Sequence, residues 1–315
     1  MSSPAMPASR FIGCDVGKTS VVVFDSAANK TRTLANEYAV LNAFAEELDE
    51  SCLVVCEATG GYEDLLLDAL LSNAIPAHRA DARKVKAFIR SFGILGKTDA
   101  IDARALARYA QERESKLVRW RTRDPDREAL QSLVLTRRDL VQQQLAFNNR
   151  LVAPGSEPSH PFIVNLLACL SRQIQDIEAK ITEILKTVQH LKQTAKILKT
   201  IPGVGVKTAA ALIALMPELG ALNRRQAASL AGLAPHPNQS GASDAYRRVR
   251  GGRAEIKRVL FMAALSATKH HPTLSTFYQK LVANGKKKLV AITAVMRKLI
   301  VIANAKLRPF ATQAI

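Results

Sequence analysis

The sequence predicts an α/β domain, followed by a helical coiled-coil region and then by a mostly α C-terminal domain. Short β-branched runs alternate with helical patterns over residues 10–112, which is typical of an α/β domain. Residues 113–198 hold a charged linker and an apolar repeat with spacings of three and four, which indicates a coiled coil. Residues 199–315 are rich in Ala and Leu with helical spacing, so we expect mainly helices there.

The α/β domain is predicted from the order of its apolar runs. The second run follows the first after a short Gly-containing turn, which favours a hairpin, and the fourth is continuous enough to be a buried strand. The expected strands are residues 11–15, 21–24, 30–34, 52–56 and 75–79, and the expected helices are residues 37–48, 62–72, 81–90 and about 99–111.

Four acidic residues occupy particular positions in this order. Asp99 and Asp102 stand three apart at the start of a helix, where they share one face. Taken alone, the pair is more typical of a helix N-terminus, with Asp99 as N-cap and Asp102 near the positive end of the dipole. Asp15 lies in the first strand and Glu57 ends a strand expected to be its parallel neighbour. Four converging carboxylates would instead bind Mg²⁺ or Mn²⁺, and two such ions serve phosphoryl transfer.

The wording around these acids resembles a known family. The motifs are Gly-Cys-Asp-Val-Gly-Lys at residues 13–18, Glu-Ala-Thr-Gly-Gly-Tyr at 57–62 and Lys-Thr-Asp-Ala-Ile-Asp-Ala at 97–103. They resemble DEDD-type transposases of bacterial insertion sequences, relatives of the Piv invertases. The element order resembles the RuvC-like branch of the ribonuclease-H-like fold. The resemblance implies that Asp15, Glu57, Asp99 and Asp102 are the metal ligands, and we expect Lys97 to contact nucleic acid.

Net charge limits the class of partner. The chain of 315 residues carries a formal charge of +18 and has a pI near 10.0. A basic protein of this size usually binds polyanions, so nucleic acid is the first candidate. An anionic membrane surface is the alternative, but we see no basic amphipathic terminal helix and no lipidation motif.

Localisation and redox state follow from features that the sequence lacks. The longest apolar runs are too short to span a bilayer, and the first ten residues have no apolar signal core, so we expect a cytoplasmic protein associated with the nucleoid. The four cysteines have neither CxxC spacing nor paired histidines nearby. We therefore expect reduced, mostly buried thiols.

The middle region contains two ambiguous features. Trp120 lies between two arginines in the charged linker at 113–126, where it would either stack on a base or, as we slightly favour, pin the linker to the core. A helix is expected at 127–151. The apolar repeat at 167–191 fits a dimeric coiled coil and an internal hairpin about equally well. The family resemblance implies a homo-oligomer, a dimer or tetramer, joined through this region.

A Gly-rich turn opens the C-terminal domain. Gly203, Gly205 and Lys207 precede an Ala-rich helix, as in the turn of a helix-hairpin-helix. Such a turn lets a phosphate approach free N–H groups at a helix start, and Lys207 adds positive charge. A simple packing turn between two helices is the alternative.

A cluster of basic residues follows a predicted loop at 235–243. With one acid among them, these residues suit phosphate binding better than a merely solvated charge run would. The candidates for nucleic-acid contact are Arg247, Arg248, Arg250, Arg253 and Arg258.

Ser240 stands in that loop, where a serine beside a glycine is ordinarily only a turn residue. In the resembled family the segment matching Gln239-Ser240-Gly241 carries a serine that joins covalently to a DNA phosphate. Such a hydroxyl needs activation, and nearby arginines would stabilise the charge of the transition state. Ser243 is the nearest competitor, and it fits the family pattern less well.

These observations predict an insertion-sequence transposase that cuts and exchanges DNA strands with Mg²⁺ and a phosphoserine intermediate. The resemblance also implies an element-encoded guide RNA. Two alternatives stay open: a RuvC-like junction nuclease that uses metal-activated water, and a non-catalytic nucleic-acid-binding protein.

Overall fold

The computed structural model describes residues 8–93, 98–121, 124–235, 238–240, 243–245 and 248–311. The chain divides into two compact units, Met1–Thr122 and Arg123–Ile315, and each is described by itself. The first unit contains the whole predicted α/β domain together with most of the predicted linker. The second contains the predicted coiled-coil helices and the C-terminal helices.

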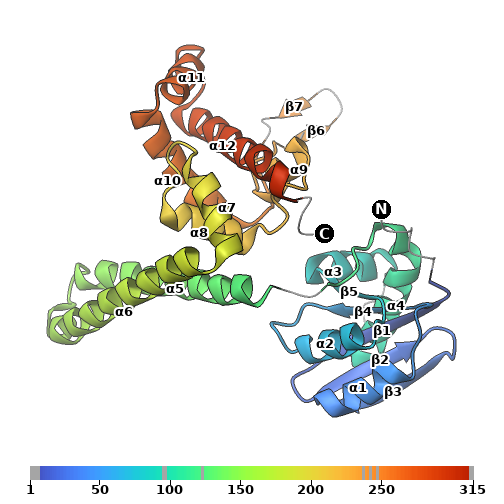
Figure 1. The fold of residues 1–315 in the computed structure, drawn as a ribbon. Helices are drawn as coiled ribbons and strands as arrows, with labels where there is room; N and C mark the ends of the chain where they lie inside the picture. Colours follow the sequence, from blue (N-terminus) through green and yellow to red (C-terminus); the bar gives the residue numbers. More distant parts are fainter. Residues whose placement is uncertain are drawn as a thin grey trace. The chain divides into compact units, whose positions relative to one another are not determined.

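The first unit is a five-stranded mixed sheet with helices on both faces (Figure 1). The strand order is β3-β2-β1-β4-β5; the β1–β2 and β2–β3 pairs are antiparallel, and the β1–β4 and β4–β5 pairs are parallel. This confirms the α/β prediction, including the first hairpin and the third strand. The elements are β1 (Arg10–Val16), β2 (Ser20–Asp25), β3 (Lys30–Ala35), α1 (Tyr38–Glu46), β4 (Cys52–Glu57), α2 (Asp64–Ser72), β5 (Ala77–Ala80), α3 (Ala82–Ser91), α4 (Asp99–Arg113) and the 3₁₀ turn η1 (Glu114–Lys116).

Two separate cores result from the alternation of side chains along the central strands. One face of β1 and β4 packs against α1 and α2, and it includes Cys14 and Cys56, which are paired in register. The other face packs against α3 and α4. Burial raises the pKa of the Cys56 thiol to about 12, so this group stays protonated and inert. Cys14, Cys52 and Cys56 are buried and free, which confirms the thiol prediction; Cys169 is free but exposed.

Trp120 holds the segment after α4 onto the sheet. Its side chain packs against the core shared with α1 and α2, and its backbone N–H donates to the carbonyl of Ala77 on β5. The guanidinium of Arg79 lies 5.7 Å from the centre of its ring. The packing interpretation of Trp120 is therefore confirmed, and the indole is not an open platform for a base.

The second unit begins with two long helices and ends in a helical bundle (Figure 1). Only one short sheet, the β6–β7 hairpin, occurs among its described residues. The elements are α5 (Pro125–Leu151), the 3₁₀ turn η2 (Glu157–Ser159), α6 (His160–Thr187), α7 (Gln189–Lys199), α8 (Val206–Leu215), α9 (Arg224–Leu230), β6 (Asn238–Ser240), β7 (Ser243–Ala245), α10 (Ala254–His270), α11 (Pro272–Ala283) and α12 (Lys288–Ala311).

Helices α5 and α6 form an antiparallel hairpin within one chain. Gln144 Nε2 donates to Ser171 Oγ near its far end, and Arg137 binds Glu178 near its base. The repeat predicted at 167–191 supplies much of the buried seam, including Leu170, Ile174 and Ile181. The helix breaks at Val188, which has an extended backbone, so the seam is not one continuous helix. Within the chain, the structure shows the internal-hairpin alternative.

Helices α7 to α12 enclose the largest core of the chain, with α8 in its middle. Seven residues of α8 are buried, which explains why its sequence is Ala-rich: small side chains let neighbouring helices approach closely. In the part of the chain that the structure describes, no helix is both long enough and apolar enough to cross a bilayer.

Candidate active site and nucleic-acid interface

Asp15 and Glu57 lie side by side at the carboxyl ends of two parallel strands. In the β1–β4 ladder Cys14 is opposite Cys56, so each acid is the residue after a matched pair. Both cysteines point into the core with α1 and α2, and alternation therefore turns both carboxylates to the opposite face. Both acids are only half-buried, and adjacent strands lie about 4.8 Å apart, so one cation could reach both.

Helix α4 covers that same face and brings its N-terminus toward Asp15. The close contact is at Gly13, where a Cβ atom would lie only 1.9 Å from the carbonyl oxygen of Ala103. Phe11, two residues earlier in β1, shares a core cluster with Leu106 and Tyr109, which lie further along α4. The helix thus runs opposite to β1, and its first turn lies over the Asp15 end of the strand.

Thr98, not Asp99, caps α4. The Thr98 hydroxyl oxygen accepts a hydrogen bond from the backbone N–H of Ile101, and Asp99 is the first helical residue. The alternative in which Asp99 is the N-cap is therefore wrong. A cap role does not account for Asp99 and Asp102, which both lie in the first turn.

Glu63 fixes the turn that follows Glu57. One of its oxygens accepts hydrogen bonds from Thr59 N, Thr59 Oγ1 and Gly61 N, at 3.1, 3.0 and 2.9 Å. The other oxygen forms an ion pair with Arg79 at 2.7 Å, and the Glu63 side chain is fully buried. Burial by itself would raise the pKa of Glu63, but these donors and Arg79 lower it below its ordinary value of 4.5. This acid was not identified from the sequence, although it stands six residues after Glu57 in the same motif.

Replacing Glu63 by Gln is expected to lower the free energy of unfolding of the first unit by about 2 kcal/mol, because a buried charge loses its partner. A depressed pKa adds stability above the ordinary value of 4.5, and this contribution is lost as the pH falls through the folded pKa. The difference between wild type and E63Q in urea unfolding should therefore shrink below about pH 4.5.

The control for this prediction is Glu47→Gln. Glu47 pairs with Arg32 in an exposed salt bridge, which contributes little to stability. E47Q should unfold within about 0.5 kcal/mol of wild type at neutral pH. Equal stability of E63Q and E47Q would contradict the role assigned to Glu63.

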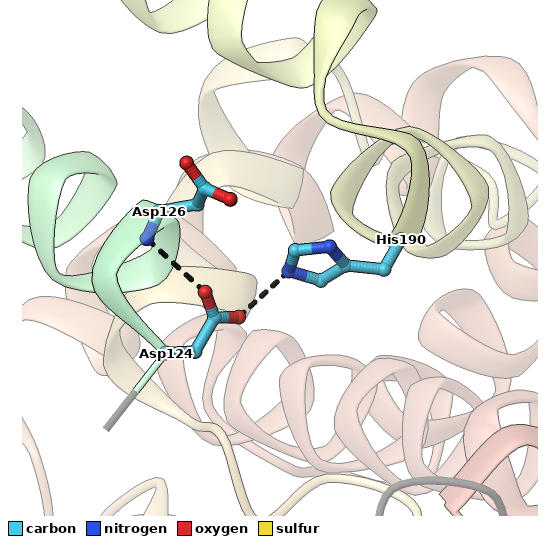
Figure 2. A group of neighbouring side chains, drawn as sticks. All are labelled: Asp124, Asp126 and His190. Carbon is cyan, nitrogen blue, oxygen red and sulfur yellow. Dashed lines mark hydrogen bonds and ion pairs between the residues drawn. The ribbon is translucent and has the colours of Figure 1, made fainter. Parts of the chain in front are cut away.

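A second cluster of potential metal ligands is found at the start of α5 (Figure 2). Ligand atoms of Asp124, Asp126 and His190 lie within 4.8 Å of one another, and no other group of three does so in the described residues. Figure 2 shows Asp124 between the backbone N–H of Asp126 and the His190 ring, whose Nε2 lies 2.7 Å from Asp124 Oδ2.

The hydrogen bonds of Asp124 explain this cluster as a helix cap. Asp124 is the N-cap of α5, and its Oδ1 accepts from the backbone N–H groups of Asp126 and Arg127. Burial would raise the pKa of Asp124, but the bonds with His190 and Arg127 lower it below 3.8. The sequence signal for the cap was Asp124-Pro125, which we had assigned to a linker. No local pattern pointed to His190.

Ser240 is the last residue of β6, paired with Ser243 of β7. The predicted loop at 235–243 is thus partly a short β-hairpin, which its composition did not indicate. The turn residues 241–242 lie outside the described part of the chain. An isolated bridge between Pro235 and Val249 closes the base of this segment. The hairpin therefore presents Ser240 next to a turn and beside the basic cluster in sequence.

The basic cluster divides into structural and exposed members. Arg253 binds both carboxylate oxygens of Glu218, at 2.7 and 2.6 Å, and the carbonyl of Leu215. Burial alone would raise the pKa of Glu218, but the bond from Arg253 lowers it. Arg253 thus holds α10 to the segment after α8, while Arg248 and Arg250 are exposed. Arg258 pairs with Glu255 at 2.9 Å. Arg247 and Lys97 lie outside the described residues.

The Gly-rich turn before α8 also packs against protein. Gly203 has a left-handed backbone (φ 78°), and a Cβ there would lie 2.2 Å from the carbonyl oxygen of Ala263 on α10. Gly205 has open space around it. Lys207 Nζ lies 2.6 Å from Glu178 on α6, and this carboxylate also binds Arg137. Gly203 and Lys207 thus make internal contacts, and of the three predicted phosphate contacts Gly205 is the most open.

Two transposase family models match the chain. A DEDD transposase model of the IS110 type matches residues 12–153, which contain all four predicted acids. A model described as transposase IS116/IS110/IS902 family matches residues 195–279, which contain the Gly-rich turn, Ser240 and the basic cluster.

Individual relatives carry related names. The pilin gene-inverting protein of Moraxella lacunata is 29% identical over 259 residues, which cover 81% of this chain and 80% of that protein. The transposase for insertion sequence element IS1111A of Coxiella burnetii is 24% identical, over 69% of this chain and 66% of that protein. An IS110 insertion-element protein of Streptomyces coelicolor is 31% identical, over 47% of this chain and 36% of that protein.

Proposed function

Because the chain belongs to the family of IS110-type DEDD transposases, we propose that it cuts DNA and exchanges strands through a covalent bond to Ser240. The observation that carries this proposal is the arrangement of β1, β4 and α4. These elements bring Asp15, Glu57 and the first turn of α4 to one face of the sheet, within the segment that matches the DEDD model.

We propose that Asp15, Glu57, Asp99 and Asp102 hold Mg²⁺ or Mn²⁺. The donor set fits such an ion, because it consists of carboxylate oxygens and includes neither thiolate nor imidazole. The membership in a DEDD family indicates a divalent metal in general terms, and the Asp124 cluster is a second place where one could bind. The hydrogen bonds of Asp124 leave the four acids as the better candidates. A bound ion would stabilise negative charge on a phosphate.

The proposed covalent step is balanced. The Ser240 hydroxyl attacks the scissile phosphorus and loses its proton, a serine–phosphorus ester forms, and one DNA P–O bond breaks to release a DNA hydroxyl that takes up a proton. A second DNA hydroxyl then attacks the same phosphorus, which re-forms a phosphodiester and frees Ser240. One ester replaces another at each step, so no external energy source is needed. Exposed Arg248 and Arg250 would stabilise the developing charge.

The proposal includes partners. A net charge of +18 suits DNA and an element-encoded guide RNA equally. Assembly into a dimer or tetramer is supported by the far end of the α5–α6 hairpin, where Leu145, Val152 and Phe162 are 61, 81 and 77% exposed. Such an assembly would let the acids of one copy work with Ser240 of another. We propose that the protein works on chromosomal DNA in the bacterial cytoplasm.

A Ser240→Ala variant is expected to form no covalent DNA adduct, because the attacking hydroxyl is removed. The measurement uses a nicked DNA carrying the element end, followed by denaturing gel electrophoresis with Mg²⁺ present. Wild type and the matched control Ser243→Ala should both give the protein-linked band. Cleavage that persists in S240A would contradict the proposal and favour the water-dependent junction nuclease.

A further inference from the structure

A cavity of about 450 Å³ lies between α3 and α4 in the first unit, beside the predicted acidic site. None of the functions assigned above uses it. Its size is within the range of small-ligand sites, which usually combine apolar walls with a few polar groups. It is lined by Thr31, Phe88, Ile89, Phe92, Ala100, Ile101, Arg104, Ala105 and Arg108.

Aromatic and aliphatic side chains form most of its wall. Phe92 follows the last residue of α3 and is 37% exposed, although large apolar side chains at helix ends usually find cover. It meets Phe88 edge to face, with ring centres 4.9 Å apart, and Phe88 in turn meets Tyr109. These contacts fix the Phe92 ring while leaving part of it accessible to a planar ligand.

Two arginines supply the charge. Arg104 and Arg108 stand one turn apart on α4, and both are exposed. The guanidinium of Arg108 lies 3.7 Å from the centre of the Phe92 ring, and that of Arg104 lies 4.5 Å from the centre of Phe24. Arg108 also pairs with Glu112, whereas Arg104 forms no ion pair among the described residues. The mouth of the cavity is therefore suited to an anionic group next to an apolar one.

Helix α4 links this cavity to the acidic site. Asp99 and Asp102 lie in its first turn, and the cavity-lining Ala100, Ile101 and Arg104 are their immediate neighbours in the helix. Because each residue advances a helix by about 1.5 Å, Arg104 is only about 3 Å further along the axis than Asp102. A strand whose phosphate lies at the acids would bring an adjacent nucleotide to the cavity.

We propose that the cavity takes one unstacked nucleobase from the DNA strand next to the scissile phosphate, with the nucleotide's phosphate on Arg104 and Arg108. This inference rests on the proposed function of the acidic site. A base offers a flat apolar face for Phe92 and carries an anion on a short tether, which matches both parts of the wall. Taking a base out of the stack would also hold the strand in place for cleavage.

The test measures binding of the full-length protein to a fluorescein-labelled oligothymidylate of twelve nucleotides by anisotropy. Phe92→Leu keeps an apolar side chain of similar volume and removes the aromatic face, so we expect affinity to fall about tenfold. Phe92→Trp should retain affinity, and its added fluorescence should be quenched by the oligonucleotide. Tyr38→Ala is the control, because Tyr38 is a similarly exposed aromatic residue, 46% exposed, in α1 on the other face of the sheet.

The outcomes separate this inference from the proposed function. Unchanged affinity in F92L, or no quenching in F92W, would overturn the base site even if S240A loses its adduct. Weaker binding in F92L together with cleavage that survives in S240A would keep the base site and overturn the serine mechanism. A change in oligomeric mass of F92L by light scattering, with unchanged DNA affinity, would assign the cavity to a second protein chain and overturn the inference.

Discussion

An Asp102→Asn variant is expected to bind DNA normally and to cut it about a thousandfold more slowly than wild type, or worse. Asn has nearly the shape of Asp, so the first turn of α4 should stay folded. What is lost is one negative charge among four carboxylates that would otherwise attract a divalent cation. Loss of several kcal/mol of charge stabilisation corresponds to about three orders of magnitude in rate.

The measurement compares single-turnover cleavage of a nicked element end across a Mg²⁺ titration. Asp126→Asn is the matched control, since Asp126 is also an acid in the first turn of a helix and belongs to the other candidate cluster. D126N should cut at the wild-type rate. If D126N loses activity and D102N keeps it, the metal lies at the start of α5 and the assignment of the four acids is wrong.

Much of the α/β unit was predictable because its signals are local. Strands β1, β2 and β4 are β-branched runs bounded by turns, and α4 begins where the apolar period changes from two to about four. Parallel pairing of β1 with β4 follows from that order, and pairing alone brings Asp15 next to Glu57. The acids could therefore be predicted together before any coordinates were known.

Roles that depend on distant partners could not be predicted in this way. Arg253 and Lys207 looked like phosphate ligands because they stand in basic or Gly-rich sequence, yet they pair with Glu218, 35 residues away, and with Glu178. Glu63 owes its role to Arg79 on β5. An ion pair across a fold leaves no spacing pattern, so a charge count assigns such residues to the surface.

Short-range misreadings had a different cause. Thr98 and Asp99 are both good N-caps, and composition alone does not show which of two adjacent residues starts the helix. Ser240 stands in a polar segment without β-branched residues, and its strand has only three residues. Pairing with β7, not propensity, makes it a strand.

Replacing Gly13 by Ala is expected to destabilise the first unit by about 3 kcal/mol and to slow cleavage as well. The added Cβ would lie 1.9 Å from Ala103 O and 2.5 Å from Ala107 N. Both are backbone atoms of α4, so no side-chain rotation relieves the overlap and the helix must move away from β1. The first turn of α4 would move with it, and a shift of about 1 Å at reacting groups costs roughly a hundredfold in rate.

Gly17→Ala is the control, because its Cβ would meet only Ser20 O at 3.2 Å, in an exposed turn of the same sheet. Urea unfolding and single-turnover cleavage should both separate G13A from G17A. The two losses should also be linked, since one displacement of α4 causes both: at a temperature where G13A remains folded, raising Mg²⁺ should restore part of its cleavage but none to D102N. A G13A variant as stable and as active as wild type would show that α4 does not contact β1 at Gly13, and the convergence of the four acids would lose its structural basis.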